Sequence, residues 1–220
     1  MYKAVRMFRR DGLLPVLSTL AVRIRSEALR RQHGYPSGFL VEQGTAWLTG
    51  PHASIGQGLR VGRRCRIETI SNHNGIAYTP HLKIGNRVSM NDDVHIGCAL
   101  SITIGDDVLL AGKIFISDHN HGDYSGTLQD SAQSLPSERA LGLAPVVIGD
   151  RAWLGEMVSV LPGVTIGEGS IIGSNSVVSR DIPPMTIAVG SPARPVKYFD
   201  SVTATWKRIE QSKETEEQVK

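Results

Sequence analysis

The stretch IGDRAWLGEMVSVLPGVTIGEGSIIGSNSVV, residues 148–178, carries an aliphatic residue at every sixth position. These residues are Ile148, Leu154, Val160, Ile166, Ile172 and Val178. A companion series of small or apolar residues follows each of them by four positions: Ala152, Val158, Val164, Ser170, Ser176 and Ile182. A helix repeats near 3.6 residues and a strand near two, so neither explains a period of six. The period predicts short strands joined by turns, three to a coil, around a narrow aliphatic core, which is a parallel β-helix.

The same period occurs earlier in the chain with interruptions. The runs are Ile55, Val61 and Ile67; then Ile84, Met90, Ile96 and Ile102; then, after a slip of two residues, Ile104, Leu110 and Ile116. Scattered strands of a β-sandwich would not share this spacing. We therefore predict an all-β solenoid over residues 51–183. The period is lost at 68–83, which predicts a bulge, and at 117–145, which predicts a projecting loop.

The two ends of the chain differ from the repeats. Residues 1–50 are expected to form a helical N-terminal segment and lead-in, and residues 184–220 an exit segment and a short C-terminal helix. Residues 1–33 contain eight Lys and Arg against two acidic residues. Two interpretations stay open for them: a basic segment resting on an anionic membrane surface, and a helical cap over the first coil.

Composition limits the function classes. There are two cysteines, and no secretory signal is recognised, so we expect a cytoplasmic protein. The apolar stretch 13–24 contains Pro15 and Arg23 and is too short to span a bilayer. No aromatic residues alternate with the arginines, so no nucleic-acid partner is expected.

The loop 117–145 opens with Ser-Asp-His-Asn-His-Gly, so His119 and His121 directly follow the last periodic residue of their run. A rigid coil would hold both histidines at the root of the loop. Histidine exchanges protons near neutral pH, and Asp118 is placed to fix its tautomer. By itself the pair is also consistent with half a metal site or with no role.

The chain resembles the hexapeptide-repeat acyltransferases, in the branch of galactoside, maltose and xenobiotic acetyltransferases. The resemblance covers roughly residues 50–198. It rests on Trp153-Leu-Gly, Pro162-Gly-Val-Thr-Ile-Gly, Ser179-Arg-Asp-Ile-Pro-Pro and Gly190-Ser-Pro-Ala-Arg. The loop sequence ISDHNHGDYSG is most similar to members that act on bacterial surface polysaccharides or their precursors.

The resemblance implies left-handed coiling, although parallel crossovers are otherwise right-handed. It also implies acetyl-CoA as co-substrate, no required metal, and a homotrimer with active sites between subunits. The acceptor would be a sugar, a glycan or a nucleotide sugar.

The resemblance also implies roles for individual residues. His119 is the expected general base, with His121 as the second choice and Asp118 beside them. The acceptor is expected to contact Asn91 and Asp92, although these residues also suit a solenoid corner. Trp153 is expected to point outward and to line the channel for the acetyl and pantetheine groups. The remaining expected cofactor contacts are Gly155, Ser174, Ser179, Arg180 and Arg194, the arginines facing the phosphates.

Alternatives remain at the level of function. The main hypothesis is transfer of an acetyl group to a sugar hydroxyl, and the alternative is transfer to an amino sugar or nucleotide-linked amino sugar. A non-enzymatic scaffold is an alternative of another class. A zinc enzyme of the same fold needs three converging histidines, and no third histidine has the expected relation to His119 and His121.

Overall fold

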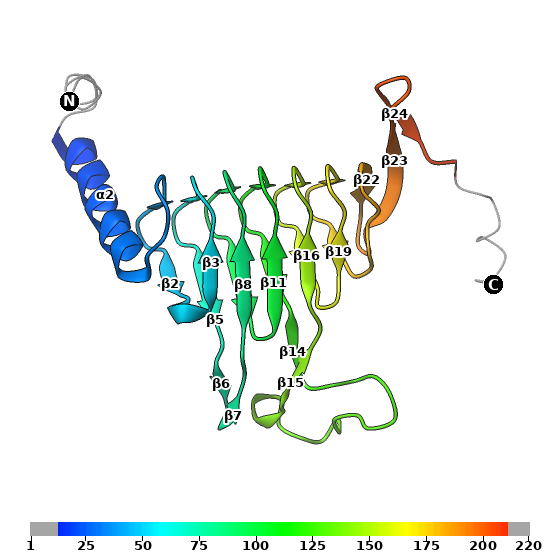
Figure 1. Ribbon diagram of the computed structural model, residues 1–220. Coiled ribbons are helices and arrows are strands. Elements are labelled where there is room, and N and C mark those ends of the chain that lie inside the picture. The colour runs from blue at the N-terminus through cyan, green and yellow to red at the C-terminus, as the bar shows by residue number, and fades with distance from the viewer. Residues whose placement is uncertain (1–12, 211–220) are drawn as a thin grey trace.

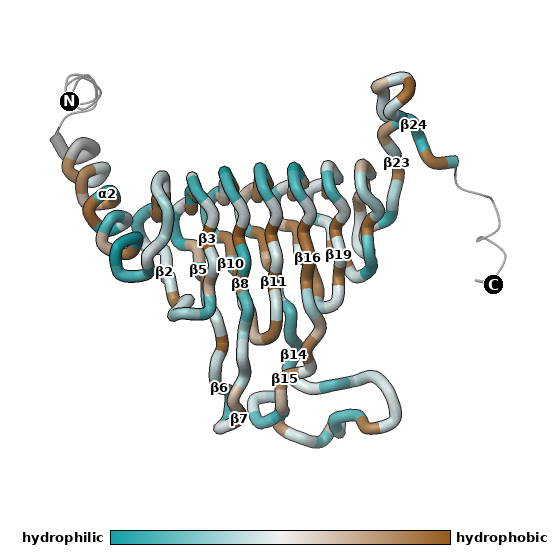
Figure 2. Tube along the Cα trace, viewed as in Figure 1, coloured by the Kyte–Doolittle hydropathy of each residue, from teal (hydrophilic) through white to brown (hydrophobic). Residues whose placement is uncertain are grey.

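The computed structural model describes residues 13–210, with side chains from residue 17 onward. One α-helix, α2 (Leu13–His33), precedes a parallel β-helix whose coils stack side by side along one axis (Figure 1). Each coil contributes a strand to three sheets in turn. Figure 2 shows that the strands are largely hydrophobic, whereas the turns along the upper edge are hydrophilic.

The strands of the three sheets are as follows. The nine-stranded sheet has the order β1 (Leu40–Val41), β4 (Arg60–Val61), β9 (Ser89–Met90), β12 (Leu109–Leu110), β17 (Trp153–Leu154), β20 (Ile171–Ile172), β22 (Thr186–Val189), β23 (Arg194–Asp200) and β24 (Thr205–Arg208). The six-stranded sheet has the order β2 (Ala46–Leu48), β5 (Arg66–Thr69), β10 (His95–Cys98), β13 (Phe115–Ser117), β18 (Ser159–Val160) and β21 (Val177–Val178). The five-stranded sheet contains β3 (Ala53–Ile55), β8 (His81–Ile84), β11 (Ser101–Ile104), β16 (Val146–Ile148) and β19 (Thr165–Ile166).

The period of six corresponds to the inward positions of these strands. Ile96 is paired with Ile116, which is paired with Val160, which is paired with Val178, and all four are fully buried. The other two sheets repeat this pattern, with Ile104, Ile148 and Ile166 in one and Leu110, Leu154 and Ile172 in the other. The predicted all-β solenoid is confirmed.

The slip of two residues in the period has a structural cause. Ile104 lies eight positions after Ile96, whereas Ile166 lies six positions after Val160. The two extra residues lie at the corner between the six-stranded and the five-stranded sheet, which we call the six–five corner (residues 99–100, 118–145, 161–164 and 179–181). They extend β10 and β11 to four residues each around the short Ala99–Leu100 turn, and Ile102 becomes a second inward residue of β11.

Glycine after an inward aliphatic residue is required by close approach of the next coil. A Cβ atom on Gly149 would lie 2.5 Å from the backbone nitrogen of Glu168. Real Cβ contacts are longer, so any side chain here would force two coils apart.

Both stretches that lack the period project from the same side of the coils (Figure 1). Residues 68–83 contain a hairpin of β6 (Asn72–His73) and β7 (Ile76–Ala77). Residues 117–145 contain the antiparallel pair β14 (His119–His121) and β15 (Leu141–Leu143), and a 3₁₀ turn at Pro136–Glu138. We call these projections the hairpin and the arm.

The β-helix begins before the predicted boundary at residue 51. Strand β1 is already paired with β4, and β2 with β5, because the lead-in carries its own inward residues Val41 and Trp47. A second 3₁₀ turn, Gly50–His52, completes this coil. Helix α2 packs on the first coil: buried Ser26 accepts a hydrogen bond from the Val41 amide at 2.9 Å. This agrees with the cap interpretation.

The predicted C-terminal helix is wrong for residues 201–210. Strand β24 is instead paired in antiparallel fashion with β23, and the rings of Phe199 and Trp206 lie 5.3 Å apart. Pairing with the open edge of the sheet satisfies backbone groups that a helix would have left there. Residues 1–12 and 211–220, which carry the rest of the basic segment and of the predicted helix, lie outside the described residues. Within residues 13–210, no helix is both long and apolar enough to cross a membrane.

Two neighbouring residues of β16 test the inward stacking. Ile148 is fully buried, whereas Val147 is 39% exposed on the outer face. Ile148→Ala should lower the free energy of unfolding by about 2–5 kcal/mol, because it leaves a cavity between coils. Val147→Ala should cost far less, since little buried surface is lost. Urea unfolding of both variants measures the difference, and equal losses would contradict the assignment of faces.

Candidate active site

A buried carboxylate lies at the six–five corner. Asp118 is fully buried directly after β13, and its two oxygens accept hydrogen bonds from three successive amides of the turn that leads from β10 into β11. The distances are 2.8 Å from the nitrogen of Ala99, 2.8 Å from that of Leu100 and 2.7 Å from that of Ser101. A buried charge is stable only when it is hydrogen-bonded in this way.

The surroundings of Asp118 keep it ionised. Burial by itself would raise the pKa of this carboxyl, but the hydrogen bonds from the His119 imidazole and from the amides of Ala99 and Leu100 outweigh burial. The pKa of Asp118 therefore lies below its ordinary value of 3.8. At neutral pH the group is a carboxylate that can only accept hydrogen bonds.

That carboxylate orients His119. The Nδ1 atom of His119 lies 3.0 Å from Oδ1 of Asp118, and the imidazole side chain is 14% exposed. Because the carboxylate can only accept, Nδ1 must carry the proton, and Nε2 keeps its lone pair. Within residues 13–210, Nε2 of His119 has no hydrogen-bond partner. This is the arrangement of an oriented general base.

His121 lacks this support. It lies two residues further along β14, is exposed, and its ring meets that of His73 in the hairpin edge-on at 5.1 Å. The geometry therefore favours His119 over His121 as the base.

The hairpin and the arm contact each other beside this corner. The Leu141 amide donates to the hydroxyl of Tyr78 at 3.0 Å, and Nδ2 of Asn74 donates to the carbonyl of Ser137. The two projections follow β5 and β13, and β10 lies between these strands. The Ala99–Leu100 turn thus lies between the base of the hairpin and the base of the arm.

Two side chains that the sequence analysis did not single out lie beside His119. Nε2 of His95 lies 3.1 Å from Oε1 of Glu68, on the outer face of β10 and β5. Glu68 belongs to the stretch where the period is lost, and 27 residues separate the two. Gly97 is the only feature of the sequence that points to this pair, because it interrupts the outer face of β10. Its φ angle is not positive, so the backbone conformation does not require glycine there.

Cys98 is the nearest thiol to Asp118, and it is buried. Burial, reinforced by the negative charge of Asp118, raises its pKa to about 12. The thiol stays protonated and is not a nucleophile at neutral pH.

Ser179 and Arg180 lie at the same corner as His119. Ile116, Val160 and Val178 are aligned in register, so the residues that follow them stack along one edge of the coils. His119 is thus one coil from Pro162 and two coils from Arg180, and both Ser179 and Arg180 are exposed.

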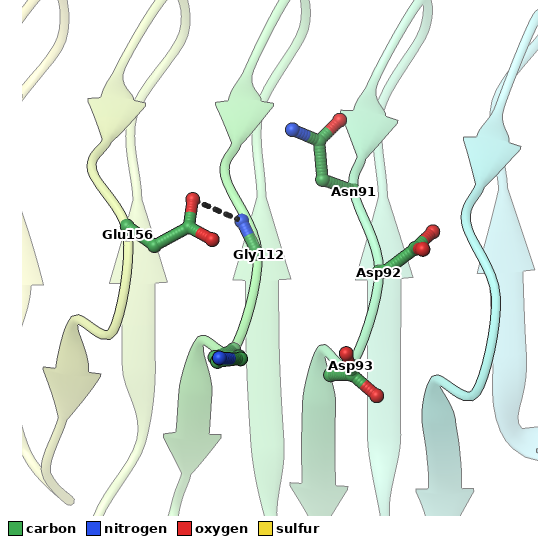
Figure 3. A pocket seen from close by; sticks show the side chains of 6 residues that line it. Asn91, Asp92, Asp93, Gly112 and Glu156 are labelled. Carbon is green, nitrogen blue, oxygen red and sulfur yellow. Dashed lines mark hydrogen bonds between the residues drawn. The ribbon is translucent and has the colours of Figure 1, made fainter.

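Four other expected site residues lie at the corner between the nine-stranded and the six-stranded sheet, the nine–six corner (residues 91–94, 111–114, 155–158 and 173–176). These are Asn91, Asp92, Gly155 and Ser174. A hollow of about 360 Å³ lies there, lined by Asn91, Asp92, Asp93, Gly112, Lys113 and Glu156 (Figure 3).

Most side chains of the nine–six corner hold turns together. Asp92 accepts from the Arg63 amide at 2.8 Å, Ser174 from the Glu156 amide at 3.1 Å, and Glu156 from the Gly112 amide at 3.2 Å. The amide of Asn91, by contrast, is exposed and points away from the coil (Figure 3).

Trp153 and Arg194 lie on the nine-stranded sheet, which does not border the six–five corner. Trp153 is 47% exposed, so it points outward as predicted, and it is paired with the exposed Leu109. One protomer therefore does not bring Trp153, Arg194 or Asn91 to His119.

A family model described as "Bacterial transferase hexapeptide (six repeats)" matches residues 145–180. The chain is 45% identical over 124 residues to WbbJ of Escherichia coli K12, whose name assigns it to O-acetyl transfer in lipopolysaccharide biosynthesis. It is 33% identical over 124 residues to the galactoside O-acetyltransferase of the same organism. These matches show that the chain contains bacterial transferase hexapeptide repeats and is similar to O-acetyltransferases.

The extent of these matches is limited. The alignments cover 56% of this chain in both cases, and 63% of WbbJ and 57% of the galactoside enzyme. The chain thus spans less than two thirds of the curated relatives it matches.

The fold is the left-handed parallel β-helix. A solved structure of a variant of AntD, an N-acyltransferase from Bacillus cereus, has a TM-score of 0.63 at 18% identity. That match covers 81% of this chain and 91% of AntD. Within residues 13–210, no three His, Cys, Asp or Glu side chains are grouped to hold a metal ion.

The three amide bonds to Asp118 predict a pH-dependent stability. Because the pKa of Asp118 is lower in the folded state than in the unfolded chain, its carboxylate stabilises the fold above about pH 4. That contribution is lost as the pH falls through the lowered pKa. Asp118→Asn should therefore reduce the free energy of unfolding at neutral pH by about 1–3 kcal/mol.

The difference between wild type and Asp118→Asn should shrink as the pH falls below about 4, and it should be smallest below the lowered pKa, where the carboxyl of the folded wild type is protonated too. Urea unfolding across this range measures it. Asp181→Asn is the control, because exposed Asp181 accepts a single amide bond that Asn can keep. A difference that stays constant with pH would contradict the role of the charge.

Proposed function

We propose that the protein is an acetyl-CoA-dependent O-acetyltransferase that modifies a sugar hydroxyl of a polysaccharide or its precursor. The observation that carries this proposal is the buried Asp118 carboxylate, which fixes His119 with Nε2 unpartnered. The names of WbbJ and of the galactoside enzyme support a hydroxyl acceptor. AntD, which was solved with coenzyme A and a dTDP-linked amino sugar, supports a sugar site in this fold.

In this proposal His119 acts as the general base. Its Nε2 takes the proton of the acceptor hydroxyl, and the oxygen attacks the thioester carbonyl, forming a C–O bond. The C–S bond then breaks, and the proton passes from His119 to the departing sulfur of coenzyme A. Asp118 stabilises the imidazolium that exists between these steps, as a buried carboxylate does beside a catalytic histidine.

The six–five corner is the proposed path of the pantetheine chain. The register of the coils aligns His119 with Ser179 and Arg180, so an extended ligand along this edge would run from the base towards a guanidinium. Arginine is well suited to phosphate groups such as those of coenzyme A. Arg194 has the same proposed role.

A homotrimer would complete the site. Asn91, Trp153 and Ser174 are too far around the coil to meet His119 of their own protomer. A three-fold assembly can bring the nine-stranded sheet of one subunit against the six–five corner of the next. The exposed row of Leu109 and Trp153 is a suitable apolar contact.

The setting of the enzyme is also part of this proposal. Acetyl-CoA and the two free, buried cysteines are consistent with the cytoplasm. Contact of the basic N-terminal segment with the inner face of the membrane would bring a lipid-linked glycan precursor to the site.

Replacing His119 tests the proposed chemistry. Release of free coenzyme A is measured from acetyl-CoA with a panel of methyl glycosides, glucosamine and UDP-linked amino sugars as acceptors. His119→Ala should lower turnover about 10²–10⁴-fold, the usual contribution of a general base. His121→Ala should retain most activity, because His121 lacks the carboxylate partner. The reverse result would reassign the base.

The same samples separate the alternatives. Turnover with amino sugars alone would establish N-acetylation instead. Coenzyme A should raise the melting temperature of wild type and His119→Ala equally, because it binds the native state. Absence of this shift would favour a non-enzymatic scaffold.

Mixed oligomers test the trimer. Chains carrying His119→Ala and chains carrying Trp153→Ala are co-expressed with different tags, and the mixed oligomers are purified. If His119 of one subunit and Trp153 of the next share a site, about a quarter of the sites in randomly mixed oligomers contain both wild-type residues. Thiol release should then exceed that of either pure variant. Sedimentation should give three times the 23.9 kDa of one chain. Activity no higher than the average of the pure variants would contradict a shared site.

A further inference from the structure

The His119 imidazole lies over the backbone of Gly97. A Cβ atom placed on Gly97 would lie 3.2 Å from Cε1 of His119, 3.8 Å from Nε2 of His95 and 3.9 Å from Oε1 of Glu68. The three side chains therefore converge over Gly97. The backbone φ of Gly97 is not positive, so glycine is needed here for space and not for conformation.

Glu68 and His95 are held in fixed positions beside this imidazole. Nε2 of His95 lies 3.1 Å from Oε1 of Glu68, and the His95 ring meets the edge of Phe115 at 5.4 Å. Oε2 of Glu68 accepts a hydrogen bond from Arg66 at 2.7 Å. The Glu68 side chain is only 13% exposed, so its orientation is well defined. Rigid polar groups beside a reactive atom are suited to orienting a substrate.

The charges beside the imidazole suit a hydroxyl donor. Oε2 of Glu68 is ion-paired with Arg66, whereas Oε1 lies on the side of His95 and His119 and can accept a second hydrogen bond. A neutral hydroxyl can donate to this oxygen and form a charge-assisted hydrogen bond.

Resting on the function proposed above, we propose that Glu68 and His95 form an acceptor site for a neutral sugar. They bind a second hydroxyl of the sugar whose acceptor hydroxyl His119 deprotonates, and Gly97 leaves the room for the His119 imidazole beside them.

Steady-state kinetics with methyl α-D-mannopyranoside and methyl β-D-galactopyranoside test this site. Glu68→Gln and His95→Asn should raise the KM for the glycoside about 10–100-fold, the usual effect of losing a hydrogen bond to a charged group. They should change kcat much less and leave the affinity for coenzyme A unchanged. Gly97→Ala should lower kcat/KM by at least as much, because its methyl group would lie 3.2 Å from Cε1 of His119 and displace the imidazole.

Two matched variants serve as controls. Glu168→Gln removes a carboxylate whose ion pair with Arg151 lies at a distant turn, and His81→Asn removes an exposed histidine of the five-stranded sheet. Both should keep the wild-type KM. An unchanged KM in Glu68→Gln and His95→Asn would overturn the acceptor site.

Saturation-transfer NMR of the same glycosides, with the full chain and coenzyme A present, gives a readout independent of turnover. Wild type and His119→Ala should both show transfer to the sugar protons, and Glu68→Gln should lose it. No transfer to wild type, or equal transfer to Glu68→Gln, would overturn the inference. Full turnover in His119→Ala would instead refute the proposed general base and leave the binding result standing.

Discussion

The stacking of coils in exact register is the constraint on which the rest of the structure depends. Each inward aliphatic residue lies beside its equivalent in the next coil, as Ile96, Ile116, Val160 and Val178 do. Burial of these side chains is the main source of stability, and it fixes every corner relative to the next. Side chains far apart in sequence are thereby aligned along an edge, which is how the arm, Pro162 and Arg180 come to share one line.

The six–five corner is a local departure from this regularity. Two additional residues extend β10 and β11, and the amides of Ala99, Leu100 and Ser101 enclose the Asp118 carboxylate. In the same coil, Gly97 leaves room for the imidazole of His119. An irregular coil thus provides both the charge that orients the imidazole and the space that the imidazole occupies.

The sequence predicts those features that depend on short-range spacing. The period of six reveals the coils, and the loop after Ile116 identifies Asp118 and His119, because both are local patterns. Glu68 and His95 could not be found in this way: they meet across 27 residues, and Glu68 lies where the period is lost. The sequence predicts a helix where β24 lies for a similar reason. The pairing of β24 with β23 depends on an edge strand of the β-helix and not on the periodicity of residues 201–210.

The two ends of the solenoid have a consequence for its behaviour at high concentration. Repeated flat coils present open edges that could join molecules end to end into fibrils. Helix α2 covers the first coil, and β23 turns back along β22 at the last, reversing the strand direction. Both caps therefore block end-to-end polymerisation, and a chain reduced to its repeats alone would aggregate.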